Sequence, residues 1–245
     1  MKIQAVLFDL GNTLMHAVDP DGWPQVFQQG NQALMDYLCE DGLDVDCDNF
    51  AEEFNHRLQK YYSEREKLML ETSTFSVLKE LLAEKGFANV IDDLIRGALD
   101  QHYAVTQQNW QLEDDTLTCL DSLKKSSIKL GLLSNAGDDR DVAQLVDRFN
   151  IRSYFEFVLT SAACGYRKPH KRIFELAMEY LSVLPGQIAV VGDKLDADIL
   201  GANQLGMYSI WINRRAELPS NGELPVQPMA IVNTLHELPS VILKK

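Results

Sequence analysis

The sequence is short of the residues that mark disulfide-rich, zinc-binding and membrane-spanning proteins. Its 245 residues include only four cysteines, without a CxxC pair or the close spacings of a zinc site or a dense disulfide framework. No apolar run approaches the roughly 18 residues of a membrane span, and the first apolar run is too short for a signal peptide. We therefore expect a cytoplasmic protein with reduced cysteines, which are Cys39, Cys47, Cys119 and Cys164.

Positive charge is also scarce. The 23 lysines and arginines face 36 aspartates and glutamates, so the formal net charge is −13 with neutral histidine. Such a chain repels a nucleic-acid backbone or an anionic membrane, and we expect neither as a partner. An anionic small molecule would have to be held by local cations, backbone amides or a metal ion.

Strand-length apolar runs alternate with helical patterns in the outer parts of the chain. The runs cover residues 3–8, 128–133, 157–159, 188–191, 208–212 and 230–232. Residues 139–149, 171–180 and 197–205 carry apolar side chains at the spacing of three and four that is typical of helices. This alternation predicts an α/β fold, a doubly wound parallel sheet of Rossmann-like type.

The rhythm stops between residues 16 and 112, where the pattern becomes helical. Helices are expected over residues 23–39, 50–70, 74–85 and 90–107, with turn signals at 19–22, Gly42 and Gly86. We therefore predict a core of residues 1–15 and 113–245 with an inserted all-helical cap of residues 16–112. An insert after the first strand lies over the carboxyl ends of the sheet, where ligands of open α/β folds bind, so it could act as a lid.

Polar residues gather in four short segments near predicted strand ends. The carboxyl ends of parallel strands share one edge of the sheet, so these segments can meet there to form one site. Their candidate residues are Asp9, Gly11, Asn12 and Thr13; Ser134 and Asn135; Lys168; and Asp193 and Asp198.

In this order and spacing, the four segments resemble the haloacid dehalogenase superfamily of hydrolases, in the branch with a helical cap inserted after the first motif. The resemblance extends from Ile3 to about Ile212. It implies that Asp9 is a nucleophile that forms an acyl phosphate, which water then hydrolyses. It also implies a Mg²⁺ ion held by Asp9, Asp193 and the backbone carbonyl of Gly11.

The same resemblance assigns the remaining residues. Ser134 and Lys168 join Asp9 as catalytic residues, and they bind the phosphate together with Gly11, Asn12 and Asn135. Thr13 and Asp198 would support these residues from outside the direct contacts with substrate and metal, and Asp198 would orient waters or the lysine.

The residues themselves leave simpler interpretations open for two of these positions. Ser134 could be a helix cap ahead of Asp138, and Lys168 could be an exposed lysine. Asp196 is expected to be a solvated carboxylate. Pro169 is expected to start a helix, and most of the basic cluster at residues 167–172 to be the solvated beginning of that helix.

One position departs from the family pattern. Phosphatases of this family usually carry a second aspartate two residues after the nucleophile as the general acid and base, and this chain has Gly11 there. Loss of a positioned acid or base costs about 10² to 10⁴ in rate, unless the leaving group is already good or another side chain substitutes. His16 and Asp138 are the first candidates to substitute.

We therefore expect a Mg²⁺-dependent phosphoric monoester hydrolase or phosphotransferase that acts on a small phosphorylated metabolite, at a rate lowered by the missing aspartate at Gly11. A 2-haloacid dehalogenase is an alternative because halide loss needs no proton. However, those enzymes work without a metal and have Ser-Ser-Asn where this chain has Val191-Gly192-Asp193. A catalytically weak, phosphate-binding regulatory protein is a third possibility.

The cap offers five aromatic candidates for substrate contact. Their helical spacing favours packing within the cap, so they do not identify the substrate. They are Trp23, Tyr61, Tyr62, Tyr103 and Trp110. Neither the substrate nor the oligomeric state follows from the sequence.

Overall fold

A computed structural model describes residues 2–40, 42–43, 47–215 and 223–244. Its centre is a six-stranded sheet with the order β5-β4-β1-β6-β7-β8, in which every neighbouring pair is parallel. The strands are β1 (Ala5–Phe8), β4 (Lys129–Ser134), β5 (Phe157–Thr160), β6 (Ile188–Gly192), β7 (Tyr208–Ile212) and β8 (Ala230–Val232). The doubly wound parallel sheet expected from the apolar runs is confirmed.

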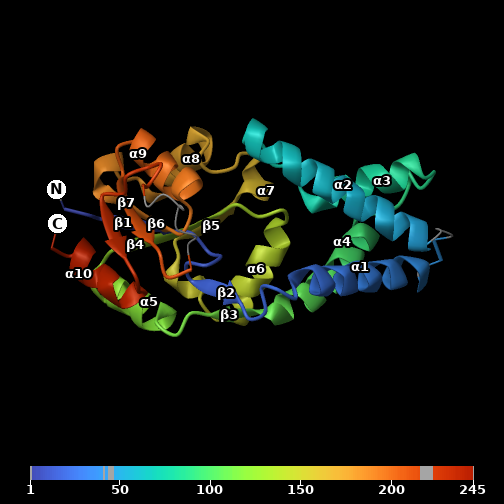
Figure 1. Cartoon of the computed structure of the whole chain (residues 1–245), viewed down its shortest axis with the longest axis horizontal. Coiled ribbons are helices and arrows are strands. Elements are labelled where there is room, and N and C mark those ends of the chain that lie inside the picture. Colours follow the sequence, from blue (N-terminus) through green and yellow to red (C-terminus); the bar gives the residue numbers. More distant parts are fainter. Residues whose placement is uncertain (1, 41, 44–46, 216–222, 245) are drawn as a thin grey trace.

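Helices cover both faces of this sheet, which is why its strands are apolar on both sides. On β1, Val6 and Phe8 pack with α5 (Thr116–Lys125), α6 (Asp139–Arg148) and α10 (Leu238–Ile242). Ala5 and Leu7 pack on the opposite face with α8 (Lys171–Leu181) and α9 (Leu200–Gln204). Figure 1 shows the sheet between these two helical layers, with both chain termini at the end remote from the cap.

The cap consists of α1 (Trp23–Glu40), α2 (Cys47–Leu68), α3 (Thr74–Glu84) and α4 (Asp92–Thr106). These helices bury an apolar cluster of their own, which includes Leu34, Phe54, Leu78 and Leu99. The four predicted cap helices are therefore present, and Figure 1 shows them gathered at one end of the molecule.

Several short elements were not predicted. β2 (Met15–Ala17) and β3 (Trp110–Leu112) form a two-stranded antiparallel sheet where the chain passes into the cap and returns. The others are the helices α5, α7 (Ser161–Cys164) and α10, the 3₁₀ turns η1 (Gln107–Asn109), η2 (Arg152–Tyr154), η3 (Pro185–Gln187) and η5 (Leu235–Glu237), and the π-helical turn η4 (Leu195–Ile199). Because β2 and β3 straddle the junction, the limits of the core at 1–15 and 113–245 and of the cap at 16–112 stay predictions.

Two details correct the sequence analysis. Pro169 does not start a helix, because His170 caps α8 with its side chain and the helix begins at Lys171. Cys39 is disulfide-bonded, which the expectation of reduced cysteines did not foresee, whereas Cys119 and Cys164 are free. Within the described ranges, the chain has no helix with the length and apolarity to cross a membrane.

The cap contacts the core along α4 and α6. Arg96 of α4 pairs with Asp138 at 3.0 Å, and Asp138 is the residue that caps α6. The Gln107 side chain donates a hydrogen bond of 2.8 Å to Asp141, and Gln144 donates one of 3.1 Å to Asp100. These buried and half-buried polar contacts hold the cap against the carboxyl edge of the sheet.

Candidate active site

The candidate site lies where the strand order reverses, at the carboxyl ends of β1, β4 and β6. Asp9 follows β1, Ser134 ends β4 and Asp193 follows β6, so the central strand and its two neighbours each contribute one residue. Ligands of open α/β sheets bind at such a switch point. The predicted meeting of residues from distant segments is therefore observed.

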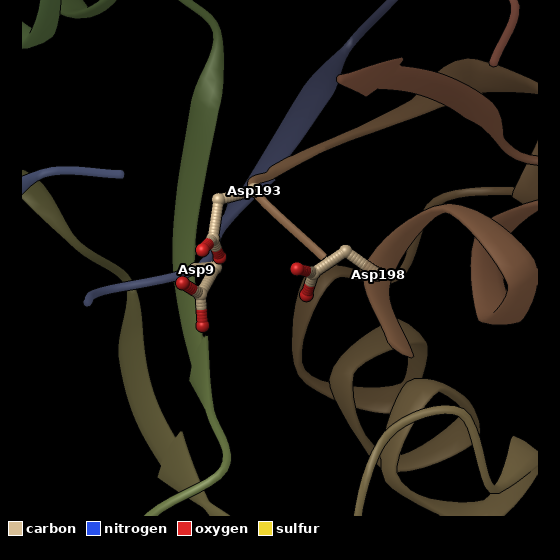
Figure 2. Close-up of side chains that lie close together, drawn as sticks. All are labelled: Asp9, Asp193 and Asp198. Carbon is tan, nitrogen blue, oxygen red and sulfur yellow. The ribbon is translucent and has the colours of Figure 1, made fainter. Parts of the chain in front are cut away.

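Three carboxylates converge in this crevice. Oxygen atoms of Asp9, Asp193 and Asp198 all lie within 4.8 Å of one another. Figure 2 shows Asp9 and Asp193 at the strand ends and Asp198 reaching toward them from η4. We call these three residues the carboxylate cluster.

Lys168 provides the positive charge inside this cluster. Its Nζ atom lies 2.7 Å from Asp9 Oδ1 and 2.7 Å from Asp198 Oδ1, and it donates a hydrogen bond of 2.7 Å to the backbone carbonyl of Leu133. Asn135 holds the Lys168 backbone, because its Oδ1 accepts from the Lys168 N–H at 2.8 Å and its Nδ2 donates to the Lys168 carbonyl at 3.0 Å. The interpretation of Lys168 as an exposed lysine is wrong.

The charges of these groups do not cancel. Burial, together with Asp9 and Asp198, raises the pKa of Asp193 to about 7. Burial also raises the pKa of Asp198 to about 6, although Lys168 opposes the rise. Burial alone would lower the pKa of Lys168, but Asp198 and Asp9 outweigh it and raise that pKa above its usual value. One ammonium thus faces three carboxylates.

Neighbouring groups fix the carboxylates in place. The Asn12 amide donates to Asp193 Oδ2 at 3.3 Å, and the buried Thr13 hydroxyl donates to Asp9 Oδ2 at 3.3 Å. Asn12 has a φ of 56°, a left-handed conformation that asparagine adopts more readily than most residues. The Lys194 N–H donates to Asp198 Oδ2 at 3.1 Å. Asp196 is exposed, as predicted.

A cavity of about 540 Å³ joins this edge of the sheet to the cap. Its core wall contains almost all the predicted site residues, which are Asp9, Gly11, Asn12, Ser134, Asn135, Lys168, Asp193 and Asp198. Thr13 is the exception, since it lies behind Asp9. Ser134 is at the end of β4 and Asp138 caps α6, so Ser134 is not a helix cap.

The cap wall of the cavity is largely aromatic. Trp23, Tyr62, Tyr103 and Trp110 line it, whereas Tyr61 donates a hydrogen bond of 2.7 Å to Glu71 instead. The prediction that these aromatic residues only pack within the cap is therefore incomplete, because four of the five also line the cavity.

Trp110 lies beside the position where family phosphatases carry an acid. A Cβ atom added to Gly11 would lie 3.6 Å from Cη2 of the Trp110 ring, an ordinary contact. The two candidate substitutes both have protein partners. His16 lies 3.0 Å from Glu113 and is not part of the cavity wall, whereas Asp138 lines the cavity and accepts from Arg96 and from two backbone amides.

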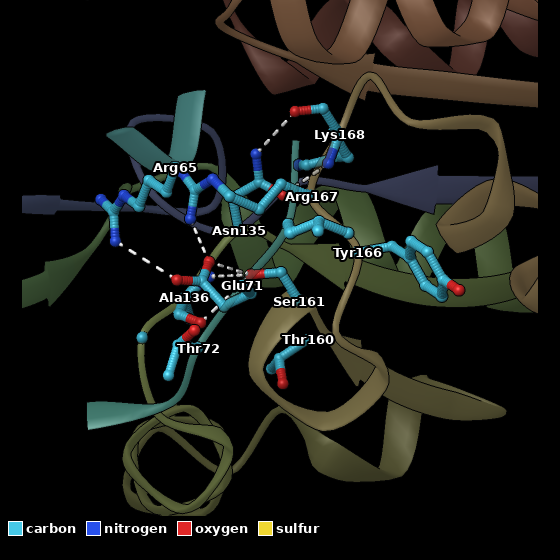
Figure 3. Close-up of polar contacts among 12 residues, drawn as sticks. Arg65, Glu71, Thr72, Asn135, Ala136, Thr160, Ser161, Tyr166, Arg167 and Lys168 are labelled. Carbon is cyan, nitrogen blue, oxygen red and sulfur yellow. Dashed lines mark hydrogen bonds and ion pairs between the residues drawn. The ribbon is translucent and has the colours of Figure 1, made fainter. Parts of the chain in front are cut away.

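A second buried ionic group lies next to the site, and Figure 3 shows its contacts. The Glu71 carboxylate, from the loop between α2 and α3, accepts hydrogen bonds from Ser161 at 2.6 Å, from Tyr61 and from Arg167. Arg65 pairs with the same carboxylate at 3.4 Å. We call Glu71, Tyr61, Arg65, Ser161 and Arg167 the Glu71 cluster.

The Glu71 cluster connects the cap to the core segments that carry Asn135 and Lys168. Arg167 directly precedes Lys168, and Ser161 accepts a hydrogen bond of 3.0 Å from the backbone N–H of Ala136, which follows Asn135. The Glu71 N–H donates to the Gly165 carbonyl at 3.0 Å. Arg167 and Lys168 are both buried, so the expectation of a mostly solvated basic cluster is wrong for these two residues.

Sequence reasoning missed Glu71, Arg65 and the placement of Trp110. Glu71 and its partners Ser161 and Arg167 are about 90 residues apart in the chain. No local pattern pairs residues at such a distance, so only the folded chain reveals the contact.

The sequence of this chain is similar to those of known hydrolases. The family model described as haloacid dehalogenase-like hydrolase matches residues 3–206. A ribulose-1,5-bisphosphate 5-phosphatase from Halopiger xanaduensis is 28% identical over 207 residues, which cover 84% of this chain and 83% of that protein. A glyceraldehyde 3-phosphate phosphatase from Methanopyrus kandleri is 27% identical over 212 residues, covering 86% and 84%.

Solved structures share the fold. The crystal structure of a 2-haloacid dehalogenase from Pseudomonas syringae pv. Tomato DC3000 superimposes with a TM-score of 0.70 at 24% identity and covers 99% of each chain. At this identity the likeness concerns the fold alone. Because the family model spans most of the chain, we conclude that the protein belongs to the haloacid dehalogenase-like hydrolases.

Proposed function

We propose that this protein is a Mg²⁺-dependent phosphoric monoester hydrolase that acts on a small phosphorylated metabolite through an aspartyl-phosphate at Asp9. The observation that carries the proposal is the carboxylate cluster around one buried lysine at the switch point of the sheet. The similarity to two phosphatases over more than four fifths of the chain supports the same reaction class.

The reaction has two displacements. In the first, a carboxylate oxygen of Asp9 attacks phosphorus, the ester P–O bond breaks, and the leaving oxygen departs with the bonding electron pair. In the second, water attacks the phosphorus of the aspartyl-phosphate and the bond to Asp9 breaks, which yields inorganic phosphate and restores the carboxylate. The water proton passes to solvent. If an alcohol replaces water in this step, the protein acts as a phosphotransferase.

Lys168, Ser134 and Asn135 act on the phosphoryl group. The Lys168 ammonium, held by Asp9 and Asp198, places a positive charge beside the attacking carboxylate. Ser134 offers its hydroxyl, and Gly11, Asn12 and Asn135 offer backbone or side-chain amides to the phosphoryl oxygens. Thr13 and Asp198 keep the nucleophile and the lysine in position.

The residues present fit a magnesium ion. Mg²⁺ prefers oxygen ligands from one or two carboxylates together with substrate and water, and Asp9, Asp193 and the Gly11 carbonyl are the proposed protein ligands. The excess of carboxylates over ammonium in the buried cluster favours a cation there. When bound, Mg²⁺ would offset the repulsion between the carboxylates and the phosphate and stabilise charge on the phosphoryl oxygens.

Gly11 sets the character of this reaction. No carboxylate at this position protonates the leaving oxygen or activates the attacking water, so the rate should depend steeply on the pKa of the leaving group. Aryl and acyl phosphates should therefore react faster than sugar phosphates, and the aspartyl-phosphate should persist.

The direct experiment compares Asp9→Asn with Asp196→Asn in hydrolysis of an aryl phosphate. An amide is a poor nucleophile and a poor ligand for Mg²⁺, so Asp9→Asn should abolish hydrolysis. Asp196→Asn, an exposed change on the neighbouring turn η4, should leave the rate unchanged. Full activity of a correctly folded Asp9→Asn variant would refute the proposal.

The absence of an acid at Gly11 also favours a second candidate, 2-haloacid dehalogenation, because halide loss needs no proton. Asp193 opposes it, since its carboxylate lies within the cluster that fits Mg²⁺. Phosphatase activity should disappear with EDTA and return with Mg²⁺. Chloride release from 2-chloropropionate by EDTA-treated protein would reverse the ranking. If neither reaction occurs and phosphate still binds, the regulatory alternative is favoured.

A further inference from the structure

We propose that the cap side of the cavity binds a planar aromatic ring, and that this ring belongs to the leaving group of the phosphorylated substrate. This inference rests on the proposed function, which it extends from a reaction class to a substrate class. The elements that carry it are the wall that closes the cavity beside Gly11 and the chemistry of that wall.

Aromatic side chains form a nearly continuous wall on the cap side. The rings of Trp110 and Trp23 meet edge to face with centroids 5.6 Å apart. Phe27, one helical turn beyond Trp23 on α1, meets His102 at 4.9 Å, and His102 meets Tyr103 at 5.1 Å, again edge to face. All five residues line the cavity. We call them the aromatic wall.

The aromatic wall begins at the reacting centre. Trp110 lies in contact distance of the Cβ position of Gly11, two residues after the proposed nucleophile. A carboxylate would project from that position in the usual phosphatases of the family, and this chain has an indole ring beside it instead. The group that departs from phosphorus on this side therefore meets a flat apolar surface.

The wall is uncharged at neutral pH, including its histidine. Burial lowers the pKa of His102 to about 4, so its imidazole is neutral. Tyr103 is also neutral, because burial raises its pKa well above the usual value. A charged leaving group would lose water here without gaining an opposite charge from these rings. An aromatic ring gains edge-to-face or offset-stacked contacts with them.

Two separate features thus favour the same kind of leaving group. The missing acid at Gly11 favours an alcohol of low pKa, such as a phenol, and the aromatic wall favours a flat unsaturated ring. Leaving-group acidity and ring recognition are different properties, so an experiment can separate them.

The binding test uses two phosphonates that the protein cannot hydrolyse. Benzylphosphonate and cyclohexylmethylphosphonate have rings of the same carbon count, but only the first ring is planar and aromatic. We expect benzylphosphonate to bind roughly three- to tenfold more tightly in calorimetric titrations with Mg²⁺ present, the range expected for aromatic pair contacts. Equal binding would overturn the proposal.

Variants of Trp110 locate the effect. Trp110→Leu should reduce the preference for the benzyl compound to less than about twofold, and Trp110→Phe should retain most of it because a ring remains. Tyr180→Leu is the matched control, since Tyr180 is an exposed aromatic residue that stacks on Phe157 away from the cavity. A preference that survives in Trp110→Leu would overturn the assignment to this wall.

The second test compares the rates at which two phosphate esters are hydrolysed. Phenyl phosphate and hexafluoroisopropyl phosphate have leaving groups of similar pKa, and only the first is aromatic. A higher kcat/KM for phenyl phosphate, lost in Trp110→Leu, supports ring recognition, and equal values oppose it.

The two tests also separate this inference from the proposed function. Preferential binding of benzylphosphonate without any phosphate hydrolysis would support the ring site and refute the hydrolase. Hydrolysis of acetyl phosphate with equal binding of the two phosphonates would support the hydrolase and refute the ring site.

Discussion

Two buried ionic groups meet at consecutive residues, Lys168 and Arg167, and they carry excess charge of opposite sign. Around Lys168, the carboxylate cluster sets three acidic side chains against one ammonium. Around Arg167, the Glu71 cluster sets one carboxylate against two guanidinium groups. Both are buried in the same region of the chain, yet they suit different roles.

The two clusters differ in how completely protein groups pair with their carboxylates. Both carboxylate oxygens of Glu71 have protein donors, which include Ser161, Tyr61 and Arg167, so this carboxylate is fully paired and links cap to core. In the carboxylate cluster, burial and the neighbouring carboxylates raise the pKa of Asp193 and Asp198, so a further cation would stabilise the cluster. The first arrangement is suited to holding a structure together, and the second to binding and chemistry.

The largest effect should come from removing the ammonium of the carboxylate cluster. Lys168→Met should lower kcat for an aryl phosphate by about 10³, equivalent to about 4 kcal/mol, because a buried charge beside the developing phosphoryl charge is lost. Lys171→Met, at the exposed start of α8, is the control and should retain activity. A loss of less than tenfold in Lys168→Met would show that the cluster does not serve catalysis as proposed.

Breaking the Glu71 cluster should act mainly on stability. Glu71→Gln leaves two buried or half-buried guanidinium groups without a carboxylate, which should reduce the free energy of unfolding by about 3 kcal/mol. In a chain of this size, that corresponds to a fall in Tm of roughly 6 to 12 °C by calorimetry. Glu80→Gln, an exposed change on α3, should leave Tm nearly unchanged. Equal Tm values for the two variants would contradict the contrast between the clusters.

A carboxylate added beside the first cluster should have a smaller effect. Gly11 lies outside the left-handed region that favours glycine, and a Cβ atom there makes only an ordinary contact with Trp110. Gly11→Asp should therefore fold and raise kcat for alkyl phosphates at least about tenfold, with less effect on aryl phosphates. Unchanged rates for both substrate types, measured in parallel, would indicate that another group already supplies the proton.

The smallest effect concerns Asp141, a half-buried carboxylate with which no cation of the described residues forms an ion pair. Asp141 receives a hydrogen bond from the Gln107 amide, and burial raises its pKa to about 7. The folded protein therefore holds the proton more tightly than the unfolded chain, so its stability should fall as pH rises from about 4 to about 7. Asp141→Asn should flatten this part of the Tm profile, whereas Asp114→Asn, an exposed change, should not. An identical slope in both variants would contradict the assignment.

Much of the core could be predicted from the sequence because its signals are local. Apolar runs marked all six strands of the sheet, and helical spacing marked the four helices of the cap. The short pair β2 and β3 was missed since three-residue strands carry too little periodicity. The helical spacing placed the start of α8 correctly at Lys171, but the assignment of its start to Pro169 was wrong because the His170 side chain caps the helix.

The candidate site was predictable where a residue follows a strand. Asp9, Ser134 and Asp193 stand at strand ends, so topology alone brings them together. Glu71 and Trp110 come from the cap, whose placement depends on contacts such as Arg96 with Asp138 that join distant segments. The sequence therefore indicated the part of the site at the sheet edge and left the part formed by the cap undetermined.

The central claim, that Asp9 is the nucleophile, can be tested by trapping the intermediate. The protein is mixed with acetyl phosphate and Mg²⁺, quenched in acid within one turnover, and digested for peptide mass spectrometry. We predict a phosphoryl group on the peptide that contains Asp9, absent in Asp9→Asn and in protein treated with EDTA. Hydrolysis of acetyl phosphate without any phosphoryl group on that peptide, or with an equal amount in Asp9→Asn, would contradict the account.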